Sequence, residues 1–197
     1  MQSFSEYISH QNLIAGALIG KGSLDNLIES IFDSATNPNS IVFTIGNGGS
    51  ASTAEHFSAD LAQMEKRTGY AVRSFCLNSQ IALSSAFAND YDYSTALAAQ
   101  LTSFKDSSYI LVAFSASGNS KNVINAVNFS LGLGKEVHCF VGFNGGEVIN
   151  NKEVINNKKV NVIYFPDSEK NYGIAENLHL TATHYVVDRL IEKFTVS

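Results

Sequence analysis

Five short apolar segments recur along the chain, separated by longer segments with apolar residues at helical spacing. Each short segment is mostly hydrophobic without strict alternation, which is typical of strands buried on both faces of a sheet. We expect strands over Ile41–Ile45, Ala71–Leu77, Tyr109–Phe114, Glu136–Val141 and Val160–Phe165. We expect helices from Ser50 to about Met64, from about Ile81, from Asn119 to about Leu131, and from about Gly173 to Phe194.

This alternation predicts an α/β fold, a three-layer sandwich with a five-stranded, mostly parallel sheet covered by helices on both faces. Ahead of the sheet, residues 2–19 and 23–35 also have helical spacing, and Gly20-Lys21-Gly22 separates them. They predict an antiparallel helical hairpin over residues 1–36, whose apolar surface needs its own sheet or another subunit as a partner. No linker or repeat divides the chain, so we expect one domain over 1–197 with its α/β core over 37–197.

The composition is globular, with 45% hydrophobic and 16% charged residues. A net charge of -5 without a basic stripe argues against a nucleic-acid partner. The chain has no apolar run that could span a bilayer and no signal peptide, so we expect a cytoplasmic protein without a membrane partner. Cys76 and Cys139 fall in predicted strands, where we expect them buried and reduced.

Two predicted strands end in small, polar turns. Gly46-Asn47-Gly48-Gly49-Ser50, the glycine turn, follows the first strand, and Ser115-Ala116-Ser117-Gly118-Asn119-Ser120, the serine turn, follows the third. Ligands of open parallel sheets bind beyond the carboxyl ends of the strands, and such turns present N–H groups, hydroxyls and a helix N-terminus to a phosphate. A tight turn or an N-cap would explain one of them but not both. Neither G-x-G-x-x-G nor G-K-[ST] is present, which disfavours dinucleotide and P-loop sites.

Candidate acid–base groups lie on two predicted helices. His56 and Asp60 are four residues apart on the helix that begins at the glycine turn, so they share a face. Glu176, His179 and His184 lie on the closing helix. An isolated histidine is more simply read as a core or surface residue, an interpretation that suits His10 and His138.

The serine turn resembles the phosphate loop of sugar-isomerase (SIS) domain proteins. The glycine turn followed by His56-Phe57 resembles the phosphoheptose isomerase branch of that family. Ala88-Asn89-Asp90-Tyr91 and the helix with His179 and His184 occur in the same order as in that branch. The resemblance covers nearly the whole chain and implies the flavodoxin-like SIS fold.

That resemblance implies an aldose–ketose isomerase of heptose biosynthesis, which converts sedoheptulose 7-phosphate to D-glycero-D-manno-heptose 7-phosphate by enediol proton transfer. It implies a zinc site formed by His56, Asp60, Glu176 and His184, with Asp60 as the base and His184 as the acid. Two of these depart from the family, because Asp60 replaces Glu and Glu176 replaces Gln. Glu176 and His184 are also about 12 Å apart along a helix at ~1.5 Å per residue, so both reach one ion only if it lies between their extended side chains.

The resemblance also implies the substrate contacts. Ser115, Ser117 and Ser120 would hold the phosphate, with Ala116 where the family has Thr. Asn47, Gly48, Gly49 and Ser50 would line the sugar, Asn89 and Asp90 would recognise hydroxyls, and Asp60 and Glu176 would face the substrate. The family's Asp-Arg-Ile-Gln stretch reads Gly173-Ile174-Ala175-Glu176, so an Asp near the site is missing.

Family members are homotetramers with sites between chains, which implies a homo-oligomer. Two alternatives stay open. The altered carboxylates and the missing Thr favour a non-catalytic SIS module that binds a protein such as a replication initiator, whereas His56 and His184 favour an enzyme. An isomerase of another phosphosugar is the third reading.

Overall fold

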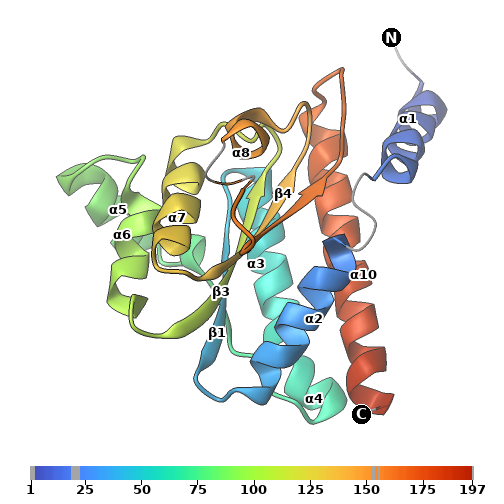
Figure 1. The fold of residues 1–197 in the computed structure, drawn as a ribbon. Coiled ribbons are helices and arrows are strands. Elements are labelled where there is room, and N and C mark those ends of the chain that lie inside the picture. Colours follow the sequence, from blue (N-terminus) through green and yellow to red (C-terminus); the bar gives the residue numbers. More distant parts are fainter. Residues whose placement is uncertain (1–2, 19–22, 152–153, 155, 197) are drawn as a thin grey trace.

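The computed structural model describes residues 3–18, 23–151, 154 and 156–196 (Figure 1). Its centre is a five-stranded sheet in the order β2-β1-β3-β4-β5, in which all neighbouring strands are parallel. The strands are β1 Ser40–Ile45, β2 Ser74–Cys76, β3 Ser108–Ser115, β4 Glu136–Val141 and β5 Val160–Tyr164. The predicted α/β fold with a parallel sheet is confirmed.

Helices cover both faces of the sheet (Figure 1). One face carries α2 Ser23–Thr36, α3 Gly49–Ala62, α4 Met64–Thr68 and α10 Tyr172–Val196. The other carries η1 Leu77–Ser79, α5 Ile81–Asp90, α6 Ala96–Leu101, η2 Thr102–Phe104, α7 Lys121–Gly132 and α8 Gly146–Asn150. The continuously apolar strands follow from this arrangement, because successive side chains enter two different cores.

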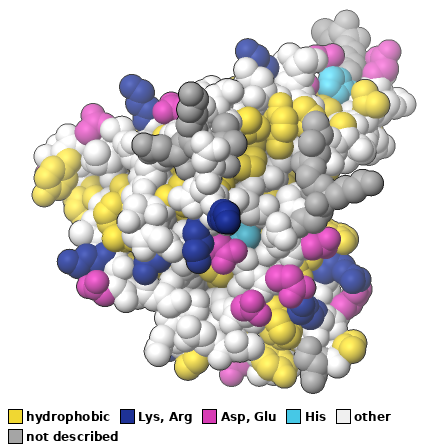
Figure 2. Space-filling model, viewed as in Figure 1, with side chains coloured by type: hydrophobic (Ala, Val, Ile, Leu, Met, Phe, Trp, Pro, Cys, Tyr) yellow, Lys and Arg dark blue, Asp and Glu magenta, His cyan; other side chains and the backbone are white. Residues whose placement is uncertain are grey.

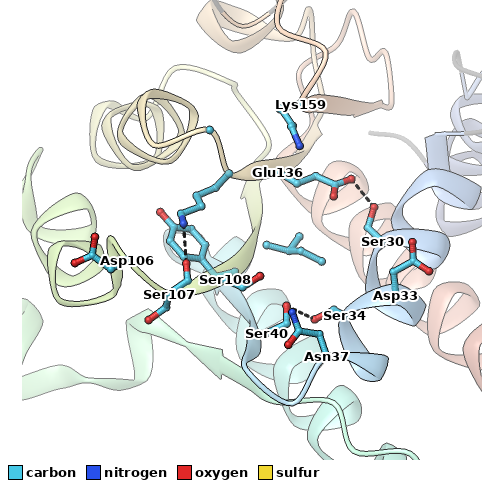
Figure 3. Close-up of a pocket in the computed structure, with 14 residues that line it drawn as sticks. Ser30, Asp33, Ser34, Asn37, Ser40, Asp106, Ser107, Ser108, Glu136 and Lys159 are labelled. Atoms are coloured by element: carbon cyan, nitrogen blue, oxygen red, sulfur yellow. Dashed lines mark hydrogen bonds between the residues drawn. The ribbon is translucent and has the colours of Figure 1, made fainter.

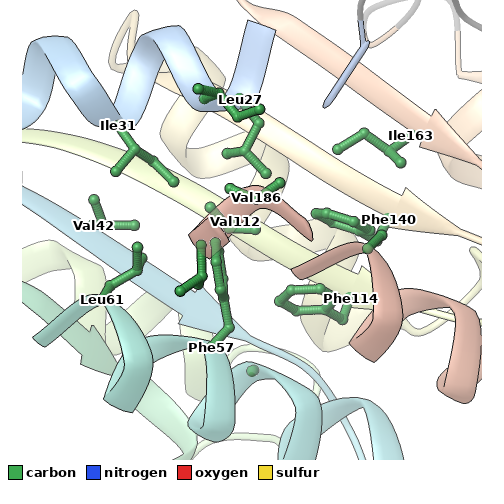
Figure 4. Packing of buried hydrophobic residues seen from close by; sticks show 14 of the residues in the cluster. Leu27, Ile31, Val42, Phe57, Leu61, Val112, Phe114, Phe140, Ile163 and Val186 are labelled. Carbon is green, nitrogen blue, oxygen red and sulfur yellow. The ribbon is translucent and has the colours of Figure 1, made fainter. Parts of the chain in front are cut away.

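Strand β3 shows the division clearly. Ile110, Val112 and Phe114 pack with α2, α3 and α10, as Figure 4 shows for Val112 and Phe114 beside Phe57 and Val186. Tyr109, Leu111 and Ala113 pack on the opposite face with α6 and α7. Complete burial of a large apolar side chain contributes roughly 1.5–3 kcal/mol relative to exposure, so these two cores fix the strand that carries the serine turn.

The two N-terminal helices are present, but they do not form the predicted antiparallel hairpin, because the first contacts α10 and the second packs on the sheet and on α10. Helix α1, Phe4–Gly16, begins at a capping box in which Glu6 N donates to Ser3 Oγ and Ser3 N donates to Glu6 Oε2. It lies beside the start of α10, away from α2 (Figure 1). Helix α2 instead buries Leu27 and Ile31 in the core of the sheet. The predicted break at 20–22 falls outside the described residues.

Two elements differ from their predicted extents. Strand β2 has three residues where Ala71–Leu77 was expected, because it is an edge strand that pairs with β1 alone. Phe75 at its centre is 57% exposed, so the apolar run there does not report burial. Helix α5 begins at Ile81 as predicted but buries none of its side chains.

Other expectations concern the surface and the thiols. Cys76 and Cys139 are free and buried, as predicted, and burial raises the pKa of Cys139 to about 12. On the face in Figure 2, Lys and Arg side chains are interspersed with Asp and Glu rather than gathered in one basic patch. None of the described helices is long and apolar enough to cross a membrane.

Candidate active site

The glycine and serine turns lie side by side at the carboxyl edge of the sheet. They follow β1 and β3, which are neighbours in the sheet. From β1 the chain first proceeds outward to β2 and then returns to β3, so the strand order reverses between β1 and β3. Such a reversal leaves a crevice outside the carboxyl ends of the strands, where open α/β sheets bind ligands.

The glycine turn brings the backbone close to whatever occupies this crevice. Gly48 has a φ of 52° and is exposed together with Gly49. A Cβ built on Gly46 would lie 2.4 Å from Ser50 O, so the tight reversal has no room for a side chain there. Helix α3 starts at Gly49, and its first N–H groups have no carbonyl partner within the helix.

The serine turn is preorganised by its own hydroxyls. Gly118 N donates to Ser115 Oγ at 3.1 Å, and Asn119 N donates to Ser117 Oγ at 3.2 Å. Ser120 Oγ is 3.5 Å from Ser115 Oγ. A hydroxyl that accepts from the backbone retains its own proton for donation, so these side chains can still bind an anion.

The segment from the end of β4 into α8 braces the serine turn. Gly142 N donates to Ala116 O at 3.0 Å, Val148 N donates to Gly118 O at 3.1 Å, and Glu147 N donates to Asn119 Oδ1 at 2.9 Å. Gly118 has a φ of 66°, and a Cβ there would lie 2.1 Å from Gly145 O. The adjacent glycines Gly145 and Gly146 allow this close approach, because both have a positive φ.

Ala116 has an apolar environment. It is buried with Phe143 and Ala175 in a small apolar cluster. In this chain the position therefore contributes packing between the serine turn and α10, with no hydroxyl.

Three of the four residues predicted to bind a metal converge. His56 Nε2 lies 3.1 Å from His184 Nε2 and 3.4 Å from Asp60 Oδ2. One ligand atom from each residue lies within 4.8 Å of the others, and both imidazoles are exposed. Two imidazole nitrogens and one carboxylate oxygen form a donor set that suits zinc and leaves one coordination position open.

Glu176 lies outside this cluster. Helices α3 and α10 both run from the carboxyl edge of the sheet, and Glu176 meets the start of α3, where a Cβ on Gly49 would lie 2.1 Å from Glu176 Oε2. His184 and His56 meet about two turns further along. Burial raises the pKa of the Glu176 carboxyl above its ordinary value.

Asn89 and Asp90 end helix α5 and are both exposed, with Asn89 Nδ2 donating to Asp90 Oδ1. The residue of this region that contacts the glycine turn is Tyr93, whose hydroxyl donates to Asn47 Oδ1 at 2.9 Å. Nothing in the sequence points to Tyr93, since an isolated tyrosine in a loop carries no spacing signal.

The remaining histidines have other contacts. His10 Nε2 lies 3.3 Å from Asp167 Oδ1, which joins α1 to the loop before α10. His138 is fully buried in β4, and its Nδ1 accepts from Asn161 Nδ2 at 2.9 Å. Neither lies in the cluster, in agreement with their reading as structural residues.

A cavity of about 540 Å³ lies at the opposite, amino edge of the sheet (Figure 3). Its lining includes Ser40, Ser108 and Glu136, the first residues of β1, β3 and β4. The two turns lie at the carboxyl edge, and His56, Asp60 and His184 do not line this cavity, so it is separate from the candidate site.

Known proteins share this sequence pattern and fold. The SIS domain family model matches residues 16–141. A phosphoheptose isomerase of Thermodesulfovibrio yellowstonii is 31% identical over 166 residues, which cover 84% of this chain and 78% of that relative. A phosphoheptose isomerase of Helicobacter pylori is 31% identical over 144 residues, covering 73% and 74%.

Two solved structures have the same fold. A phosphoheptose isomerase of Neisseria gonorrhoeae superposes with a TM-score of 0.80 at 24% identity, covering 95% of this chain and 94% of that one. A phosphoheptose isomerase of Francisella tularensis gives a TM-score of 0.81 at 24% identity, covering 96% and 94%. The chain belongs to the SIS domain family, in its phosphoheptose isomerase branch.

Proposed function

We propose that this protein isomerises sedoheptulose 7-phosphate to D-glycero-D-manno-heptose 7-phosphate. The proposal rests on one observation: His56 and Asp60 of α3, the helix that starts at the glycine turn, lie next to His184 of α10. The serine turn lies on the adjacent strand end, so an anionic group and a sugar carbonyl can be held in one crevice. The names of the relatives support the heptose phosphate as the substrate.

The phosphate is assigned to Ser115, Ser117 and Ser120 and to the N–H groups at the start of α7. No cation is needed, because hydroxyls and backbone N–H groups of a helix N-terminus bind phosphate by themselves. The sugar then extends toward Gly48, Gly49 and Ser50. Glu176 of α10, which lies against Gly49, faces the sugar beside the start of α3 rather than completing the histidine cluster.

Isomerisation moves one proton between two carbons and another between two oxygens. In this proposal Asp60 removes the proton from carbon 1 of the ketose and returns it to carbon 2 of the enediol. His184 donates a proton to the carbonyl oxygen on carbon 2, and the hydroxyl on carbon 1 returns a proton to His184 as the new carbonyl forms. The Asp60 side chain is one methylene shorter than the family's Glu, and its Oδ2 lies 3.4 Å from His56 Nε2.

His56, Asp60 and His184 fit a zinc ion. When bound, such an ion would polarise the sugar carbonyl and stabilise the negative charge of the enediolate. With the metal present, His56 and His184 would be fixed in the tautomers that place a lone pair on Nε2.

We also propose that the chain self-associates as a tetramer. Phe4 and Leu13 of α1 are 79% and 74% exposed, and Ile81 of α5 is 78% exposed. Helices with apolar side chains at their surface and few buried residues need a partner. Asn89 and Asp90 would then be free to contribute to a neighbouring subunit's site.

A coupled assay with sedoheptulose 7-phosphate and added zinc tests the enzyme reading. We expect turnover by the wild type and its loss in Asp60→Ala. If the wild type does not turn the sugar over and Asp60→Ala behaves in the same way, the non-catalytic module would be supported instead. A panel of other ketose phosphates separates the heptose isomerase from an isomerase of another phosphosugar.

A further inference from the structure

Three asparagines join the carboxyl ends of β2, β1 and β3. Asn78, which follows β2, accepts from Gly46 N at 3.0 Å and donates to Gly46 O at 2.8 Å. Asn47 and Asn122 exchange two hydrogen bonds, each of 2.8 Å, from Nδ2 of one to Oδ1 of the other. The glycine turn is therefore held from both sides by side-chain amides.

The Asn47 side chain is largely occupied by these contacts. Its Oδ1 accepts from both Asn122 Nδ2 and the Tyr93 hydroxyl, which uses both lone pairs of the carbonyl oxygen. One Nδ2 proton is donated to Asn122. Asn47 thus has no acceptor left for a sugar hydroxyl, and its side chain serves to hold the turn.

Asn122 lies at the start of α7, two residues after Ser120, and is only 3% exposed. A buried amide needs hydrogen-bond partners. The Asn47–Asn122 pair is satisfied at only one distance between the glycine turn and the serine turn. Among the described residues, no other side-chain hydrogen bond joins the glycine turn and α3 to the serine turn and α7. Amides are neutral at all ordinary pH values, so these two hydrogen bonds do not depend on the protonation of either partner.

We propose that Asn122 and Tyr93 are positioning residues that set the length of the sugar phosphate that the site accepts. The serine turn holds the phosphate, and the glycine turn begins the helix that carries His56 and Asp60. The spacing between the turns therefore determines which carbon of a phosphate-anchored chain reaches Asp60. This inference rests on the proposed function for its substrate, whereas the coupling of the turns does not.

Two variants test it, with a control on the same helix. Asn122→Leu removes both bonds to Asn47 at similar volume, and Tyr93→Phe removes one hydroxyl from a residue that is 60% exposed, so the fold is retained. Asn128→Leu is the control, because Asn128 is also on α7 and lies outside the asparagine network. The probes are sedoheptulose 7-phosphate, fructose 6-phosphate, ribulose 5-phosphate and inorganic phosphate as a competitor.

We expect Asn122→Leu to lower kcat about tenfold or more, since a misplacement of 1 Å can cost about a hundredfold. The ratio of kcat/KM for the seven-carbon over the five-carbon sugar should fall, with a smaller decrease in Tyr93→Phe. Inhibition by inorganic phosphate should stay within about twofold of wild type, because the serine turn is intact. A selectivity ratio unchanged in both variants would overturn the inference.

Hydrogen exchange distinguishes this failure from failure of the proposed function. A wild type that turns over none of the three sugars would contradict the proposed substrate. The coupling itself predicts faster amide exchange at residues 47–52 in Asn122→Leu than in Asn128→Leu. Equal exchange in these two variants would overturn the coupling, whatever the activity.

Discussion

His56 and His184 face each other edge to plane across the contact of α3 with α10, with ring centroids 5.0 Å apart and planes at 64°. The two side chains lie 128 residues apart in the sequence and come from helices on the same face of the sheet. Two exposed imidazoles held this close, with Asp60 beside them, are arranged for a shared cation or a shared proton.

Zinc binding tests the first possibility. We expect the purified protein, loaded with zinc and desalted, to retain about one ion per chain by elemental analysis, as a three-ligand site would. His56→Ala and His184→Ala should each lose it, and His10→Ala, which changes a histidine outside the cluster, should not. Retention of zinc by both cluster variants would show that the ion binds elsewhere.

The carboxylate of Asp60 is the predicted base. Asp60→Asn keeps the shape of the side chain and removes its basicity, so we expect kcat to fall by roughly 10²–10⁴. Asp60→Glu should recover much of the activity, and Glu65→Gln, on the neighbouring helix α4, should behave as wild type. The ranking is measured with the coupled assay, and equal rates for Asp60→Asn and wild type would exclude this role.

Gly118 supports the serine turn through a close backbone contact. Gly118→Ala would add a Cβ that lies 2.1 Å from Gly145 O, at a φ of 66°. Gly69 has a similar φ of 83° but open space around it, so Gly69→Ala reports the backbone strain alone, roughly 1–2 kcal/mol. We expect Gly118→Ala to be less stable than Gly69→Ala in urea unfolding and to bind inorganic phosphate more weakly. Equal losses of stability would argue against the contact.

His179 predicts a dependence of stability on pH. It is fully buried among Phe114, Phe140 and Phe165, and burial lowers the pKa of its imidazole from 6.5 to about 4. Between about pH 6.5 and about pH 4, the His179 imidazole is protonated in the unfolded chain but neutral in the folded protein. Stability therefore falls as the pH is lowered through this range. The loss is on the order of 3 kcal/mol for this one group.

Urea unfolding between pH 7 and pH 4 measures it. The decrease in the free energy of unfolding as the pH is lowered should be smaller in His179→Leu than in wild type. Parallel curves for His179→Leu and wild type would contradict a neutral, buried His179.

Self-association is predicted to involve the exposed apolar side chains of α1 and α5. Leu13→Glu and Ile81→Glu should each lower the mass measured by light scattering after gel filtration, because a charge in a buried interface is strongly unfavourable. Glu65→Gln serves again as the control. A wild-type mass equal to that of one chain, 21.3 kDa, would contradict the tetramer.

Strands buried on both faces were predictable from the sequence, and β4 has the predicted bounds, Glu136–Val141. The strand predicted over Ala71–Leu77 was too long, because an apolar run in the sequence does not show that the strand lies at the edge of the sheet. The rule that open parallel sheets bind ligands beyond the carboxyl ends of their strands was enough to predict that the glycine turn and the serine turn form one site.

The contacts that hold those turns were not predictable. Asn47, Asn122 and Tyr93 meet across 75 and 46 residues of sequence, and single asparagines and tyrosines have no periodicity that reports a partner. The distance along the helix between Glu176 and His184 predicted that they could hardly share one ion. Only the structure shows that Glu176 instead lies against Gly49.

The common direction of α3 and α10 has a consequence for the evolution of this chain. Gly49 meets Glu176 and His56 meets His184, so the two helices advance in step from one contact to the next. Each added residue rotates an α-helix by about 100°. A single-residue insertion or deletion between 176 and 184 would therefore turn one of the two contacts away from its partner, whereas changes of length beyond Leu190 would leave both in place. This interval of α10 should tolerate substitution far better than any change in length.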